Sequence, residues 1–147
     1  LRCDKITYLL LEETLKLFLN SSALSTKHPV MRMLTEPVDV VQDRATRLAK
    51  AIGAVSADIK VVDSAAQVGS GAMPVETIPS AAVTIVSDLT SNELSRRLRM
   101  GETPVVGYVR DEVLHLDVRT VSEEEIQIAS ISIRAALDPE WRSPCAT

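Results

Sequence analysis

Arginine is the residue type in this sequence best suited to binding an anion. Arg119 ends a run of mostly apolar strand residues, a position where a surface arginine is not the default. An arginine at a strand end can donate two parallel hydrogen bonds to a carboxylate or a phosphate. A salt bridge to Asp117 or Glu123 explains the same residue equally well, so both interpretations stay open. Arg2, at the edge of the chain among other charged residues, is equally ambiguous.

A glycine-rich segment offers backbone amides in place of side chains. It consists of Gln67, Val68, Gly69, Ser70 and Gly71. Such a segment can direct N–H groups toward an anion, although a tight surface turn is the simpler interpretation. His28 and His115 are isolated, and the strand pattern around His115 favours an ordinary strand-face residue over a catalytic base.

Composition excludes several classes of protein. The formal net charge of −4 and the pI of about 5.2 lack the basic character of a domain that binds nucleic acid by itself. Three arginines near residues 96–99 are typical of a solvated helix face.

The two cysteines, Cys3 and Cys145, have no zinc-ligand spacing, so we expect no metal and a reduced, cytosolic protein. No apolar run approaches the roughly 20 residues of a membrane span, so no membrane partner is expected.

The first predicted element is a helix over residues 4–19. Apolar residues surround most of its circumference and leave one narrow charged stripe. A helix of this kind needs cover on more than one side, so we expect part of it to pack against protein outside this chain. The polar run at 20–22 predicts its end, and a loop is expected through Pro29.

Changes in hydrophobic period predict the remaining elements. They are a helix at 35–52, strands at 57–64 and 82–86, a helix at 90–101, a hairpin with strands at 105–109 and 113–118, and a helix at 122–137. The last two helices begin with capping pairs, Thr90 with Glu93 and Ser122 with Glu125. Residues 65–80 contain two glycines and two prolines and are expected to form a loop. This order predicts an α+β fold, a mainly antiparallel sheet with helices packed on one face.

Six short segments carry a family resemblance. They are LRCDK at 1–5, MLT at 33–35, QVGSGAMP at 67–74, IPSAA at 78–82, PVVG at 104–107 and LDVRTV at 116–121. In this order and at these separations they resemble the C-terminal part of the bacterial selenocysteine synthases, the L-seryl-tRNA(Sec) selenium transferases. The match extends to about Leu137. Tyr108 departs from the arginine that often follows PVVG in the family. The start at Leu1, without a methionine, predicts a fragment boundary.

The resemblance implies the small C-terminal domain of a pyridoxal-phosphate enzyme of fold type I. We expect a long helix at 1–20 that bridges the large and small domains, a small domain at 35–138 and a tail at 139–147. In the family, the lysine that binds pyridoxal phosphate lies in a Gly-Asp-Lys motif upstream of the position matching Leu1. None of the five lysines here lies in such a motif. The resemblance therefore implies no catalytic residue in this chain and an inactive fragment.

For the intact enzyme, the resemblance implies conversion of seryl-tRNA(Sec) and selenophosphate to selenocysteinyl-tRNA(Sec). The reaction proceeds through a dehydroalanyl intermediate on the cofactor, in a cytoplasmic homo-oligomer. Arg2 matches the second arginine of an active-site Arg-x-x-Arg pair, which suits the selenium donor. Arg119 matches a position that receives a substrate carboxylate in related enzymes. Because a seryl ester has no free carboxylate, we expect Arg119 to hold a carbonyl oxygen or a neighbouring acid.

The segment from Gln67 to Pro74 is expected near the mouth of the active site. Two alternatives to the transferase stay open. One is a selenocysteine-synthase-like lyase that acts on a small phosphorylated substrate. The other is a domain that serves only oligomerisation.

Overall fold

A computed structural model describes residues 3–19, 21–68 and 77–143 of the chain. The chain divides into two compact units, Leu1–Glu36 and Pro37–Thr147, and each is described here by itself. Six helices and four strands lie in the described residues. In this part of the chain, no helix is long and apolar enough to cross a membrane.

The first unit is helical throughout its described residues. Its helices are α1 (Lys5–Leu19), α2 (Ser21–Lys27) and α3 (Pro29–Thr35). The loop predicted through Pro29 is therefore wrong. Ser21 and Ser22 of the polar run begin α2, and Pro29 begins α3 at a position where a missing N–H costs nothing. His28 caps this helix, since its Nδ1 accepts a hydrogen bond from the Met31 amide at 3.3 Å.

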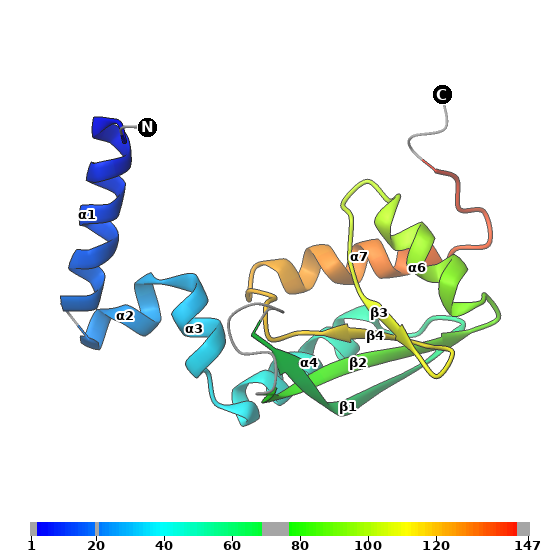
Figure 1. The fold of residues 1–147 in the computed structure, drawn as a ribbon. Helices are drawn as coiled ribbons and strands as arrows, with labels where there is room; N and C mark the ends of the chain where they lie inside the picture. Colours follow the sequence, from blue (N-terminus) through cyan, green and yellow to red (C-terminus); the bar gives the residue numbers. More distant parts are fainter. Residues whose placement is uncertain (1–2, 20, 69–76, 144–147) are drawn as a thin grey trace. The chain divides into compact units, whose positions relative to one another are not determined.

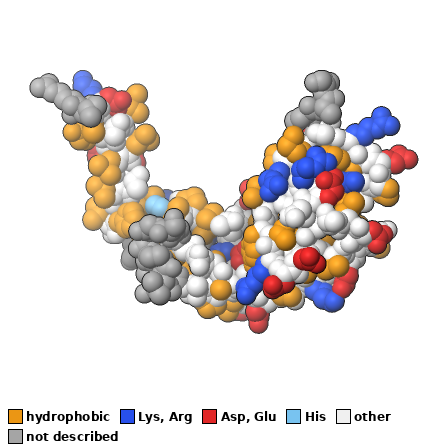
Figure 2. Space-filling model, turned by 45° about the vertical axis from the view of Figure 1, so that its right-hand side comes forward, with side chains coloured by type: hydrophobic (Ala, Val, Ile, Leu, Met, Phe, Trp, Pro, Cys, Tyr) orange, Lys and Arg blue, Asp and Glu red, His pale blue; other side chains and the backbone are white. Residues whose placement is uncertain are grey.

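Helix α1 exposes its apolar residues. None of its residues is buried, and Ile6, Leu10 and Leu15 are 68%, 65% and 55% exposed. Figure 2 shows apolar side chains along this helix. Phe18 makes an edge-to-face contact with His28, at 5.6 Å between ring centroids. The predicted helix is confirmed, and its apolar surface lacks cover among the described residues of its own unit.

The second unit is an antiparallel sheet with helices. In chain order its elements are α4 (Val38–Ile52), β1 (Ala57–Gln67), β2 (Thr77–Ser87), α6 (Ser91–Arg99), β3 (Tyr108–Arg110), β4 (Val113–Asp117) and α7 (Glu125–Leu137). The strand order is β1-β2-β4-β3, and every neighbouring pair is antiparallel (Figure 1). The predicted α+β class is confirmed.

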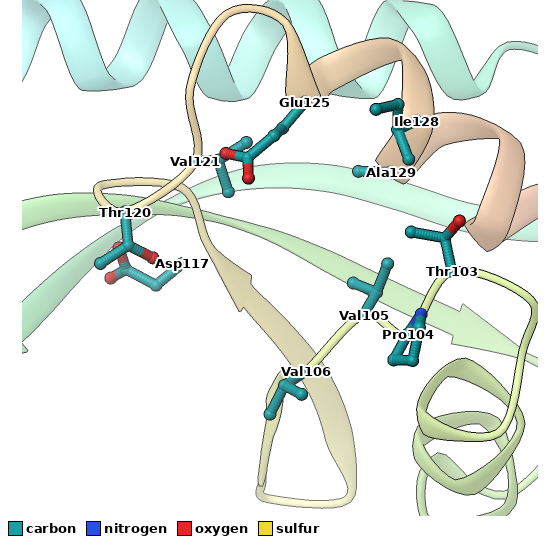
Figure 3. A pocket seen from close by; sticks show the side chains of 10 residues that line it. All are labelled: Thr103, Pro104, Val105, Val106, Asp117, Thr120, Val121, Glu125, Ile128 and Ala129. Atoms are coloured by element: carbon teal, nitrogen blue, oxygen red, sulfur yellow. The ribbon is translucent and has the colours of Figure 1, made fainter.

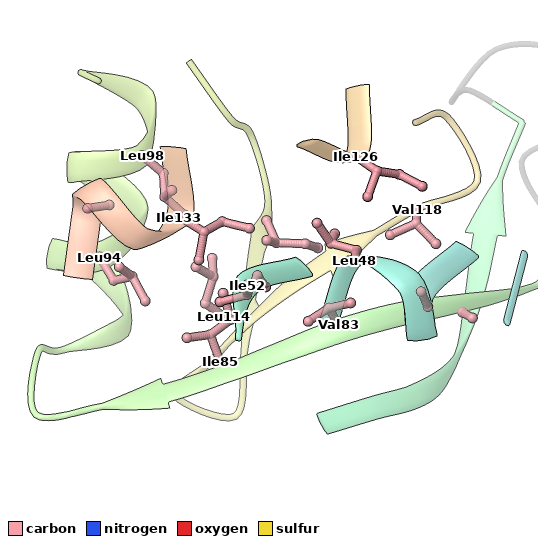
Figure 4. Packing of buried hydrophobic residues seen from close by; sticks show 14 of the residues in the cluster. Leu48, Ile52, Val83, Ile85, Leu94, Leu98, Leu114, Val118, Ile126 and Ile133 are labelled. Carbon is pink, nitrogen blue, oxygen red and sulfur yellow. The ribbon is translucent and has the colours of Figure 1, made fainter. Parts of the chain in front are cut away.

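The core lies between one face of this sheet and helices α4, α6 and α7 (Figure 4). Alternate residues of β2 and β4 point into it, because successive side chains of a strand face opposite sides. The sheet contributes Ala81, Val83, Ile85, Leu114 and Leu116, and the helices contribute Val41, Leu48, Ile52, Leu94, Leu98, Ile126 and Ile133. The opposite face carries Ser64, Ser80 and Asp117.

Strand boundaries differ from those predicted. Strands β1 and β2 pair from Ala57↔Ser87 to Gln67↔Thr77, so residues 65–67 and 77–80, expected in a loop, extend the hairpin. Thr77 and Ile78 favour a strand, whereas Ala65 and Ala66 have low strand propensity and are held in the ladder by their pairing with β2. Strand β3 begins at Tyr108, later than predicted. Helix α7 begins at Glu125 rather than Ser122, although the Glu125 carboxylate accepts the Ser122 amide as a capping pair would.

Candidate functional site

Arg119 follows the end of β4 and is buried. Its exposed fraction is 3%. The amide of the preceding residue, Val118, donates to the Ala81 carbonyl at 3.1 Å, which continues the pairing of β4 with β2. The Arg119 guanidinium donates through Nη2 to the Pro79 carbonyl near the start of β2. The side chain is therefore held across the end of the sheet rather than extended into solvent.

Asp117 lies on the sheet face opposite the helices and accepts three hydrogen bonds. Its Oδ1 accepts from the Ser80 hydroxyl at 2.8 Å and from the Arg119 amide at 3.0 Å. Its Oδ2 accepts from the Ser64 hydroxyl at 2.9 Å. The Tyr108 hydroxyl lies 3.2 Å from Ser64 Oγ and extends the network to the edge strand. The Asp117 carboxylate thus links β1 and β2 to the backbone of Arg119, just after β4.

Glu123, the other acid predicted as a partner of Arg119, is bound by arginines of α4. Arg44, buried with 2% of its side chain exposed, donates from Nε to Glu123 Oε1 and from Nη1 to the Val118 carbonyl, both at 3.3 Å. Arg47 donates to both carboxylate oxygens of Glu123. Helix α4 therefore holds both ends of the turn that contains Arg119. Sequence reasoning missed Arg44, whose partners lie more than 70 residues away along the chain.

A cavity of about 290 Å³ lies beside this turn (Figure 3). Its apolar walls come from the 103–106 segment and from α7, and its polar lining includes Asp117, Thr120 and Glu125. Both carboxylates have partners, since Asp117 accepts the three donors described above and Glu125 accepts the Ser122 amide. Arg119 does not line this cavity, so the described residues do not combine the cavity and the arginine into one pocket.

Of the other predicted site residues, Gln67 is the one that lies within the described part of the chain. Arg2, Gly69, Ser70 and Gly71 lie outside the described residues. Gln67 is exposed and ends β1, where it pairs with Thr77, so it belongs to a strand rather than to the predicted loop.

The strand-face interpretation of His115 is confirmed. Its ring stacks on Tyr108 with 5.0 Å between centroids, and the two residues are cross-strand partners. Tyr108 also reaches Ser64 through its hydroxyl. In the described residues, no group of three or more His, Cys, Asp and Glu side chains could hold a metal ion.

The basic cluster on α6 is used within the fold. Arg96 and Arg97 both hydrogen-bond to Glu93, and each guanidinium carbon lies 5.2 Å from the ring centroid of Trp141. Hydrogen bonds from Arg96 and then Arg97 lower the pKa of Glu93 from 4.5 to about 2. The same pairing raises the pKa of Arg96. Figure 2 shows acidic and basic side chains intermixed on the second unit, which agrees with an internally paired surface.

Two further pKa shifts belong to the first unit, at Asp4 and Lys16. Hydrogen bonds from Lys16 to Glu13 and Glu12 raise the pKa of the lysine, and the Thr7 backbone amide lowers the pKa of Asp4 as it caps the helix start. These shifts come from local helix pairs.

Comparison with known proteins identifies the family. A family model for L-seryl-tRNA selenium transferase (SelA) matches residues 1–122. The chain is 40% identical over 134 residues to L-seryl-tRNA(Sec) selenium transferase of Escherichia coli O45:K1 (strain S88 / ExPEC), covering 85% of this chain and 28% of that protein. The proteins of the same name from E. coli O139:H28 (strain E24377A / ETEC) and Shigella boydii serotype 18 are 39% identical with the same coverage. The chain thus spans little more than a quarter of the length of these curated relatives, and it belongs to the L-seryl-tRNA selenium transferase family.

Proposed function

We propose that this chain is the C-terminal part of an enzyme that converts seryl-tRNA(Sec) and selenophosphate to selenocysteinyl-tRNA(Sec) in the cytoplasm. The observation that carries the proposal is the family match over residues 1–122, together with 40% identity to a protein named for this transfer. The names of the relatives favour a transferase over a lyase that acts on a small phosphorylated substrate.

Pyridoxal phosphate is the cofactor that we propose for the parent enzyme, and the residues present here do not form its site by themselves. All five lysines, at positions 5, 16, 27, 50 and 60, are exposed. Lys16 pairs with Glu12 and Glu13, and Lys60 pairs with Asp58. When bound, this cofactor withdraws electrons from the α carbon of an amino-acid substrate. We place its lysine in the part of the parent that lies outside this chain.

Within this chain, Arg119 is the residue that we propose to contact substrate. A planar guanidinium suits the carbonyl oxygen of an aminoacyl ester, and burial against Pro79 limits its rotamers. Arg2 is the candidate for the anionic selenium donor, and the segment after Gln67, with Gly69, Ser70 and Gly71, is the candidate active-site loop. All of these residues would bind or orient substrate groups, and none would take part in bond making.

The organisation that we propose for the parent has a bridging helix at 1–20, a small domain at 35–138 and a tail at 139–147. Its support is twofold: the apolar surface of α1 lacks cover among the described residues of its own unit, and the second unit has its own core. The match covers only 28% of the length of the E. coli relative, so most of a parent of that length would be available to cover this helix. We further propose that the parent is a homo-oligomer, as the resemblance implies.

Activity of the full-length protein that carries this segment tests the proposal. With pyridoxal phosphate, seryl-tRNA(Sec) and selenophosphate, we expect selenocysteinyl-tRNA(Sec), detected by mass spectrometry of the amino acid released from the tRNA. Omitting selenophosphate is the control and should leave no selenium in the product. Turnover of a small phosphorylated amino acid in place of seryl-tRNA would contradict the proposal.

The fragment interpretation has its own test. Pyridoxal phosphate titrated into the 147-residue chain and treated with borohydride should give no stoichiometric adduct, whereas the full-length protein should give one. A single modified lysine in the 147-residue chain, located by peptide mapping, would overturn our placement of the cofactor lysine.

A further inference from the structure

We propose that Asp117 is a positioning residue for Arg119, which it orients through the backbone without touching substrate. The inference rests on the proposed substrate role of Arg119 and adds a second residue to that function.

Three donors from three chain segments meet at the Asp117 carboxylate. Ser64 belongs to β1 and Ser80 to β2, and these two residues are direct cross-strand partners. The third donor is the Arg119 amide, two residues after Asp117 itself. Because Ser80 is 1% exposed, water cannot easily replace the hydrogen bond that it donates. The carboxylate therefore fixes the end of β4 relative to both strands of the long hairpin.

Arg119 is consequently held at two points. Its amide is bound by Asp117, and its guanidinium is bound by the Pro79 carbonyl, one residue before Ser80. Both contacts depend on the same end of β2, since Asp117 is bound by Ser80 and the guanidinium by Pro79. A shift of the Arg119 backbone would move the guanidinium away from Pro79, so the two contacts support each other. A guanidinium that binds a substrate oxygen needs such placement, because a hydrogen bond weakens steeply when its donor–acceptor distance or angle departs from the preferred range.

Both carboxylate oxygens of Asp117 accept hydrogen bonds from groups of the fold, which favours a role in holding the backbone over direct contact with substrate. An asparagine at this position would keep the shape of the side chain and one acceptor oxygen, but it would lose the charge that strengthens all three bonds. Asp117→Asn should therefore weaken the three hydrogen bonds less than Asp117→Ala does.

Steady-state kinetics of the full-length protein, with seryl-tRNA varied at saturating selenophosphate, tests the inference. We expect Asp117→Ala to raise KM for seryl-tRNA about ten-fold while kcat stays within about two-fold, because binding rather than chemistry is disturbed. Asp117→Asn should give an intermediate KM and serves as the folded variant if the alanine protein does not fold. The double variant Asp117→Ala/Arg119→Ala should have the KM of Arg119→Ala alone, since both changes remove one function.

Asp63→Ala is the matched control. Asp63 lies on β1 next to Ser64 and accepts a hydrogen bond from Gln42 at 2.9 Å. Because Asp63 belongs to the other sheet face, the KM of the Asp63→Ala variant for seryl-tRNA should equal that of the wild-type protein. A purely structural role for Asp117 would reduce the amount of active enzyme and lower kcat at unchanged KM, which would overturn the inference. Additive effects in the double variant would overturn it as well. An inactive wild-type protein would instead overturn the proposed function.

Discussion

Gly107 lies at a position where the fold leaves no room for a side chain. A Cβ at this position would lie 2.5 Å from the carbonyl oxygen of His115 and 2.6 Å from Leu116 Cδ2. We expect Gly107→Ala to lower the free energy of unfolding by about 1–3 kcal/mol, because β3 would have to move away from β4. Urea denaturation of the 147-residue chain measures this change.

Gly101→Ala is the control for that substitution. The nearest atom to its Cβ would be the Arg97 carbonyl oxygen at 3.5 Å, an ordinary contact distance. Its free energy of unfolding should change by less than about 0.5 kcal/mol. Equal changes in the free energy of unfolding at the two positions would show that close packing is not the reason for a glycine at position 107.

Glu93 provides a pH-dependent contribution to stability. Its folded-state pKa of about 2 lies below the ordinary value of 4.5, so the stability that it adds is fully present above pH 4.5 and is lost as the pH falls toward 2. We expect Glu93→Gln to lower Tm at pH 7, with a deficit that shrinks below pH 4.5 and vanishes near pH 2. Circular dichroism melts across this range measure the deficit. The effect should be small, because the pair with Arg96 is solvent-exposed.

Glu102→Gln is the comparison for this experiment. Glu102 is exposed in the turn after α6. Its substitution should give melting curves that follow those of the wild-type chain at every pH. A Tm deficit of Glu93→Gln that persisted unchanged at pH 2 would contradict a charge-dependent origin.

At the scale of elements, helix α4 and the turn before α7 are joined by arginines of different burial. Arg44 and Arg47 both bind Glu123, but their side chains are 2% and 44% exposed. We expect Arg44→Ala to cost about 2–4 kcal/mol in free energy of unfolding, because it leaves a cavity in the core and removes the bond to the Val118 carbonyl. Arg47→Ala should cost less than about 1 kcal/mol. Chemical denaturation of both variants compares them directly, and equal costs would contradict the burial argument.

Local pattern predicted most elements because each depends on nearby residues. The period of three and four along α4 and the capping pair of Thr90 with Glu93 are local signals, and the Thr90 hydroxyl does accept the Glu93 amide. Helices α2 and α3 were missed because each has only seven residues, too few to show a helical period, and α3 depends on a histidine cap. The extension of β1 to Gln67 was missed because it is stabilised by its partner β2 rather than by its own propensity.

At the scale of the whole molecule, the site was only partly predictable. Arg119 stood out because its position after a strand is local information. Alternation in β4 could also have placed Asp117 on the face away from the core. Its partners Ser64 and Ser80, in contrast, depend on the register of the β1–β2 hairpin, and the contact of Arg44 with Val118 depends on tertiary packing. Neither the register nor the packing can be read from residue spacing.

The uncovered surface of α1 leads to a prediction about the parent protein. Leu15 is 55% exposed in this chain, yet a helix with this many apolar residues is unfavourable in water. If the rest of the parent covers it, a cysteine at this position should react with a thiol reagent at least about ten-fold more slowly in the full-length protein than in the 147-residue chain. Stopped-flow labelling of Leu15→Cys in both proteins, with the native cysteines replaced by serine, measures the ratio. Glu102→Cys should react at equal rates in both, and equal rates at Leu15 as well would mean that the bridging helix is not covered by the large domain.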